Sequence, residues 1–204
     1  MPGLCLLHRC GHRGNVGEVP YPSSMPRRFI SPSVIERIAA DVLESSGTLD
    51  ARDSHRVDIV AVAHSYGARV QYVQFDPPTV SARVSRVGTD SRFTYRIEIN
   101  ASESEVRRRF SIAHELAHVI LHDDRDREFT FTEFRAPLDS YPDTQELYKE
   151  VQANMLGAAL LMPQSQVTQF WRKRQDVDDL AGVFEVSRET AFWRLNNLNL
   201  LSDE

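Results

Sequence analysis

The feature that most constrains this chain is a pair of histidines one helical turn apart, in the segment His114-Glu115-Leu116-Ala117-His118. Residues four apart lie on the same face of an α-helix. Two imidazoles at this spacing can therefore bind one tetrahedral zinc ion. Glu115 is rotated by about 100° around the helix axis from His114, which places it beside the metal. There it is able to hold and deprotonate a metal-bound water.

The residues around this pattern predict that its helix is buried. The uncharged positions that flank or separate the three polar residues are Ile112, Ala113, Leu116, Ala117, Val119 and Ile120. A helix that is apolar on nearly all sides packs in the interior. Buried ionisable side chains are costly unless they are satisfied, and a metal ion satisfies them. We favour this interpretation over the alternative, two core histidines bonded to the backbone.

Zinc in a catalytic site needs a third protein ligand and an open position for water. His122 does not qualify, because eight residues of straight helix separate it from His114 by about 12 Å. It remains a candidate for contacting a substrate or for closing the helix end, where the helix dipole favours a cation.

A second helix, expected over residues 144–162, offers the better ligands. Glu150 and Asn154 share one face, so Glu150 can bind the metal while Asn154 supports it or a histidine from behind. Glu146 lies one turn earlier and is the rival ligand. The residues alone leave both glutamates open.

Hydrophobic periodicity predicts an α+β fold, with a small antiparallel sheet packed on the histidine-bearing helix. Helices are expected at 33–47 and 58–66, and strands at 69–75, 80–87 and 92–99, the last two joined by a turn at 88–91. Ser102 and Glu105 have capping-box spacing and predict the start of the motif helix, which continues to about His122. The loop at 123–142 contains an extended piece at 129–131, and Pro163 ends the second long helix.

Residues 1–31 are expected to form a disordered tail, since they hold four prolines and four glycines without periodicity. Met25 is a candidate for the true start of translation. The cluster Cys5, His8, Cys10 and His12 contains metal-ligand residue types, but its spacing matches no common zinc module. Cys5 and Cys10 are the only two cysteines of the chain, and so few cysteines favour a reducing, cytoplasmic setting. We see no run long enough to span a membrane.

Residues 32–163 are expected to form the metal-binding domain, and residues 164–204 a helix-turn-helix-like segment packed on it. Ser187 is a suitable cap for its second helix. A recognition helix would read DNA with Arg188, Thr190, Trp193, Arg194 and Asn197. However, this segment has five Lys or Arg against seven Asp or Glu, and the whole chain has a net charge of −5. DNA-reading modules are seldom acidic, so we expect packing or partner docking here instead of DNA binding.

Several motifs together resemble the ImmA/IrrE family of metallopeptidases. They are the His114–His118 pattern, then Glu150-Val-Gln-Ala-Asn154, then Leu160-Leu-Met-Pro163, with further likeness at 107–113 and 57–67. The likeness extends over about residues 33–200. Two departures stand out: Gln152 replaces a frequent glutamate, and Leu156-Gly157 replaces Phe-Ala, which places a glycine inside a helix.

The resemblance implies a zinc endopeptidase in which Glu150, not Glu146, is the third ligand. It also implies that the substrate is a helix-turn-helix repressor of stress or mobile-element genes. Glu115 would take the water proton and pass it to the leaving amine. Candidates for stabilising the oxyanion are His122, Tyr141 and Tyr148, and the strand at 92–99 is expected to dock the substrate or to lie beside the one that does.

Three alternatives stay open. One is a partner-docking regulator with a structural metal and little peptidase activity. Another is a DNA-binding regulator that uses its C-terminal helices. Manganese or iron in place of zinc is the third, because similar ligand sets bind these metals.

Overall fold

Four strands form one mixed sheet in the order β1-β3-β2-β4, accompanied by seven helices in the described ranges of the computed structural model. The structure describes residues 30–48, 55–87, 93–123, 129–134 and 144–201. The elements are, in chain order, α1 (Pro32–Ser46), α2 (Ile59–Ser65), β1 (Ala68–Val73), β2 (Val80–Arg86), β3 (Tyr95–Asn100), α3 (Glu105–His122), β4 (Thr130–Phe134), α4 (Thr144–Leu161), α5 (Gln164–Lys173), α6 (Val177–Phe184) and α7 (Arg188–Asn197). This confirms the predicted α+β fold with a helical C-terminal part. The tail before residue 30, including its Cys/His cluster, and the turn at 88–91 lie outside the described residues.

The expected all-antiparallel sheet is wrong for one pair of strands. β3 pairs with β2 and β2 with β4 in antiparallel fashion, but β1 and β3 are parallel. The chain reverses between β1 and β2 and again between β2 and β3, so β3 runs in the direction of β1. It then inserts between the first two strands, which makes the β1–β3 pair parallel. Alternation along a strand predicts its two faces but not its neighbours.

β3 is an inner strand, with β1 on one side and β2 on the other. Its backbone groups are already paired on both sides, so it cannot accept an added peptide strand. The expectation that the strand at 92–99 docks the substrate itself is therefore wrong, whereas the expectation that it lies beside the docking strand stays a prediction. Among the described strands, β1 and β4 are the edges of the sheet.

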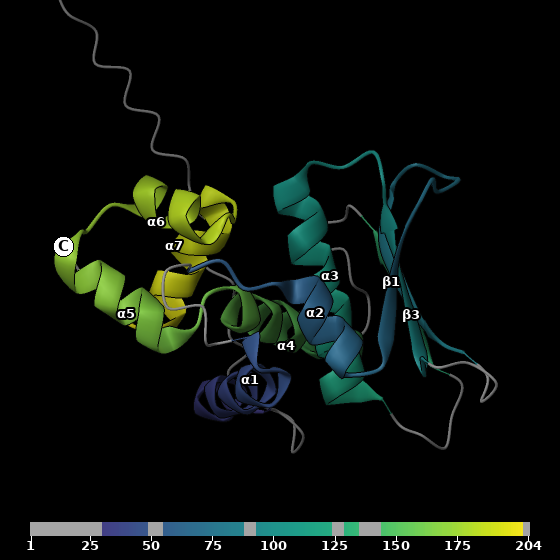
Figure 1. Cartoon of the computed structure of the whole chain (residues 1–204), viewed down its shortest axis with the longest axis horizontal. Coiled ribbons are helices and arrows are strands. Elements are labelled where there is room, and N and C mark those ends of the chain that lie inside the picture. Colours follow the sequence, from purple (N-terminus) through teal and green to yellow (C-terminus); the bar gives the residue numbers. More distant parts are fainter. Residues whose placement is uncertain (1–29, 49–54, 88–92, 124–128, 135–143, 202–204) are drawn as a thin grey trace, which may run out of the picture.

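The histidine-bearing helix α3 lies between the sheet and α4 (Figure 1), and α1 packs on α4. Inward-facing strand residues such as Val84, Ile97 and Ile99 are fully buried, whereas Arg96 on the other face is exposed. Burial on two sides explains why α3 is apolar around most of its circumference. Polar groups in its middle are thereby removed from water.

Helix α3 begins two residues later than the predicted capping box. Its N-cap is Ser104, whose hydroxyl accepts from the Arg107 N–H at 3.4 Å. Ser102 instead donates its N–H and its hydroxyl to the Asn100 side chain at 3.0 and 2.7 Å. The turn that leads out of β3 thus uses Ser102, and the helix takes the next serine as its cap. No helix in the described ranges has the length and apolarity to cross a bilayer.

Candidate metal centre

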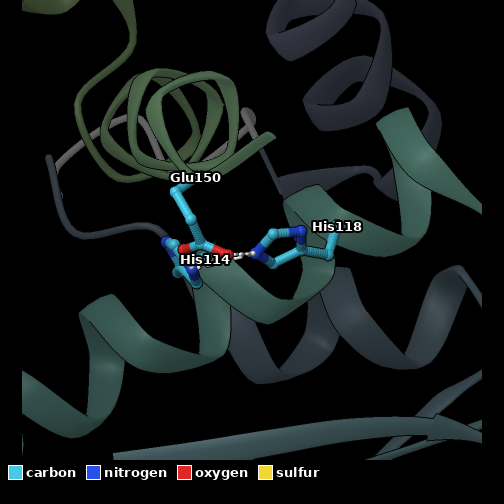
Figure 2. Close-up of side chains that lie close together, drawn as sticks. All are labelled: His114, His118 and Glu150. Atoms are coloured by element: carbon cyan, nitrogen blue, oxygen red, sulfur yellow. Dashed lines mark hydrogen bonds and ion pairs between the residues drawn. The ribbon is translucent and has the colours of Figure 1, made fainter. Parts of the chain in front are cut away.

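Three side chains from two facing helices meet at one point. His114 and His118 project from one face of α3, and Glu150 reaches them from α4 (Figure 2). The Nε2 atoms of the histidines are 3.0 Å apart. The Glu150 carboxylate places Oε2 3.2 Å from His114 Nε2 and Oε1 3.3 Å from His118 Nε2.

These separations fit a tetrahedral zinc site. Zinc–nitrogen and zinc–oxygen bonds of about 2.0–2.1 Å at a tetrahedral angle place neighbouring ligand atoms about 3.3–3.4 Å apart. The separation of the two Nε2 atoms, and that of each Nε2 from a different oxygen of the Glu150 carboxylate, lie within a few tenths of an ångström of that value. Over the described part of the chain, this is the one group of three His, Cys, Asp or Glu residues close enough to share an ion. Two histidines and one glutamate form a donor set that catalytic zinc sites use, with a fourth position left for water.

The protonation states of the three groups suit a metal. Burial lowers the pKa of His118 to about 4, although the Glu150 carboxylate opposes this shift. Burial on its own would raise the pKa of Glu150, but the two histidines beside its carboxylate bring that pKa well below its usual range. At neutral pH Glu150 is therefore a carboxylate and the His118 imidazole is neutral, and these are the states in which each can bind a cation.

Asn154 orients one of the two histidines. Its Oδ1 lies 2.9 Å from His114 Nδ1. An amide oxygen only accepts, so Nδ1 carries the proton, and the lone pair of His114 is on Nε2, facing the cluster. Asn154 is one turn after Glu150 on α4, which is the supporting position that the sequence predicts.

Gly157 lets the two helices approach closely at the site. A Cβ at this position would lie 3.2 Å from the His114 backbone nitrogen and 3.3 Å from the carbonyl carbon of Ala113. Because Glu150, Asn154 and Gly157 recur at three- to four-residue spacing, they share one face of α4. The helical glycine that the sequence presents as a departure from the family pattern thus has a packing reason.

None of the other predicted site residues within the described ranges belongs to the cluster. Glu146 is exposed to solvent and takes no part. His122 donates from Nε2 to the Lys149 carbonyl at 3.2 Å, and burial lowers its pKa to about 4, so it is neutral. Tyr148 is buried, and Tyr141 lies outside the described residues. Glu115 is fully buried in α3, between the two histidines in sequence.

Sequence reasoning missed one aromatic contact at the site. The ring of Phe131, on β4, stacks on His118 with centroids 4.4 Å apart and planes inclined by 17°. The alternation Phe129-Thr130-Phe131 does predict an extended segment. It carries no sign that the segment would lie against a histidine of α3.

The C-terminal helices contribute buried apolar side chains to the core, and one proposed DNA-reading residue is buried with them. Ser187 caps α7 through the Thr190 N–H at 3.0 Å, and Leu180, Phe184 and Leu195 are fully buried. Arg194 is also buried. Its Nε donates to the Met162 carbonyl at 2.9 Å, and its guanidinium binds the Glu36 carboxylate. A side chain enclosed in this way cannot enter a DNA groove, so its assignment as a DNA-reading residue is wrong.

We expect Arg194→Ala to destabilise the protein. Removing one partner of a mostly buried ion pair leaves Glu36 and the Met162 carbonyl unsatisfied, at a cost of roughly 2–4 kcal/mol once the partial exposure of Glu36 is considered. Urea denaturation measures the effect. Arg188→Ala is the control, because it removes an exposed ion pair with Asp178 and should cost less than about 1 kcal/mol. A urea midpoint of Arg194→Ala equal to that of the wild type would contradict a stabilising role for the ion pair between Arg194 of α7 and Glu36 of α1.

Comparison with known proteins supports the sequence resemblance. A family model, Peptidase_M78, described as the IrrE N-terminal-like domain, matches residues 63–196. Among solved structures, a Mycobacterium tuberculosis transcriptional regulator is similar at 18% identity with a TM-score of 0.48, over 81% of this chain and 46% of the regulator. This chain therefore spans less than half of that protein's length. No curated protein matches. Because the family model covers about two thirds of the sequence, including all three residues of the metal cluster, the chain belongs to the IrrE N-terminal-like, Peptidase_M78 family.

Proposed function

We propose that this protein is a zinc-dependent endopeptidase that cleaves a helix-turn-helix repressor in the cytoplasm and so controls stress or mobile-element genes. The observation that supports it most is the convergence of His114, His118 and Glu150 at zinc-ligand spacing, with Glu115 in the same helix. Membership of a peptidase family supports the same chemistry.

In this proposal the metal is held by the two imidazoles and the Glu150 carboxylate. Bound zinc supplies Lewis acidity, which makes a water more acidic and polarises a peptide carbonyl. Glu115 accepts the proton of the attacking water and delivers it to the departing amine nitrogen. Its burial between the ligand residues keeps this carboxylate away from bulk water. Asn154 keeps the proton of His114 on Nδ1, and so keeps the Nε2 lone pair available.

We infer that the substrate binds along β4. This strand is an edge of the described sheet, and its Phe131 contacts a metal ligand directly. An extended peptide that adds to a sheet edge forms main-chain hydrogen bonds along its length. Such a peptide on β4 would run close to His118. Tyr141 and Tyr148 stay predictions for stabilising the oxyanion, whereas His122 already donates its Nε2 proton to Lys149.

Metal removal tests the proposal. The probe is the helix-turn-helix repressor encoded nearest to this protein's own gene, incubated with the zinc-loaded chain and analysed by gel electrophoresis and mass spectrometry. We expect one or a few internal cuts, their loss after treatment with a chelator, and their return when one equivalent of zinc is added. Cleavage that continues in the metal-depleted protein, or no cleavage of the repressor by the zinc-loaded protein, would contradict the proposal.

A further inference from the structure

The two histidines of the cluster are held in different ways. His114 Nδ1 has a hydrogen-bond acceptor in Asn154. His118 Nδ1 is buried and has no hydrogen-bond partner among the described residues. Metal-binding histidines usually use the second nitrogen to fix the orientation of the ring. No hydrogen bond from a described residue to Nδ1 therefore orients His118.

The contact that takes this place is the stacked ring of Phe131. At a centroid distance of 4.4 Å and an inclination of 17°, the two rings lie nearly parallel and in contact. By comparison, the ring of Phe110 lies beside His114 with centroids 6.3 Å apart and planes inclined by 35°, so it is not stacked on that histidine. A close parallel ring obstructs rotation of the imidazole plane, because a rotated ring would collide with its face. Stacking thus restricts His118 to one plane.

Phe131 is itself anchored from two sides. Its ring packs on Phe129 at 5.2 Å, and Phe129 packs edge-on against Tyr95 of β3 at 5.9 Å. The Lys149 ammonium lies over the Phe131 ring at 5.5 Å, which is within cation–π range. Lys149 immediately precedes the metal ligand Glu150. The ring therefore connects the edge of the sheet, the ligand on α3 and the ligand-bearing turn of α4.

We propose that Phe131 is a positioning residue for the metal centre, which fixes the plane of the His118 imidazole so that its Nε2 lone pair points at the ion. The role rests on the proposed function, since it presumes that the cluster binds zinc. Phe131 coordinates nothing and moves no proton. Because the stacked ring restricts the imidazole before metal binds, it reduces the conformational entropy that His118 loses on binding.

Metal titration of matched variants tests this role. Phe131→Leu keeps an apolar side chain but removes the ring, and Phe131→Tyr restores the ring. Zinc dissociation constants are measured by competition with a chromophoric chelator, and the geometry of the site is monitored by the visible absorption of bound Co²⁺. We expect Phe131→Leu to weaken zinc binding by about tenfold and to change the Co²⁺ bands, and Phe131→Tyr to stay within about twofold of the wild type.

Two further variants calibrate the result. Asn154→Ala removes the known support of the other histidine, and should weaken zinc binding by about 10- to 100-fold. Phe93→Leu removes an aromatic contact with His64, at 5.5 Å, that involves no residue of the cluster, and should leave the metal affinity unchanged. If Phe131→Leu does not fold, proton NMR of the wild type decides. The His118 ring protons should lie upfield of those of His114, since His118 alone is stacked on a ring.

The outcomes separate this role from the proposed function. Equal zinc affinity and equal Co²⁺ spectra for Phe131→Leu and the wild type would overturn the positioning role and leave the metal site standing. An absence of the upfield shift would overturn it as well. Failure of the wild type to bind either metal would overturn the proposed function and the positioning role together.

Discussion

Glu150→Gln is expected to abolish tight zinc binding. The amide keeps the shape of the side chain but loses the negative charge, and a neutral amide oxygen is a poor zinc ligand. The loss should exceed about 100-fold in affinity, because groups that only support a ligand already account for 10- to 100-fold. Competition titration and the zinc content of the purified protein measure it. Cleavage of the repressor should disappear in parallel.

Glu146→Gln is the matched control for this substitution. It makes the same chemical change one turn earlier on α4, at an exposed position. We expect wild-type zinc content and wild-type cleavage. If Glu150→Gln kept its zinc while Glu146→Gln lost it, the ligand assignment that the facing helices support would be wrong.

Glu115→Gln is expected to separate metal binding from catalysis. Glutamine is close in size to glutamate, so the buried position should tolerate it, and all three ligands remain. The amide cannot accept the proton of the attacking water. Loss of a general base lowers rates by about 10²- to 10⁴-fold. Single-turnover cleavage of the repressor should fall by this factor, while zinc content and circular dichroism stay unchanged.

The same variant tests the docking alternative in cells. If the protein acts by hydrolysis, a strain that carries Glu115→Gln should keep its target genes repressed. If it acts by docking on its partner with a structural metal, derepression should survive although the repressor stays intact. The second result would replace the peptidase proposal with a binding function.

The local part of the site was predictable from sequence because helical spacing is a local property. Hydrogen bonding along the helix fixes 3.6 residues per turn, so the His114–His118 pair faces one side wherever the helix lies. The same rule places Asn154 one turn after Glu150. Spacing could not choose between Glu150 and Glu146 without the family resemblance. The facing helices bring Glu150 to the histidines and leave Glu146 in solvent.

Contacts between elements required the tertiary structure. The pattern of alternation in each strand was readable, but the insertion of β3 between β1 and β2 was not, since any pair of half-buried strands can be neighbours. From the sequence, Arg194 is expected to be an exposed basic residue of a recognition helix. In the structure it is buried and bonded to Glu36, which lies 158 residues away in the chain. Gly157 and Phe131 likewise have roles only because α3 lies within reach.

The sequence by itself determined the helix that carries the two imidazoles of the candidate metal site, the burial of that helix, and the acids that can complete the site. Only the tertiary structure showed that Glu150 lies against both imidazoles, how closely the second helix approaches, and which ring lies against His118. The physical reason is the distance along the chain over which each kind of interaction acts. Backbone geometry and periodicity act over a few residues, whereas packing distances between helices and strands depend on side chains that are far apart in the chain and meet only in the folded protein.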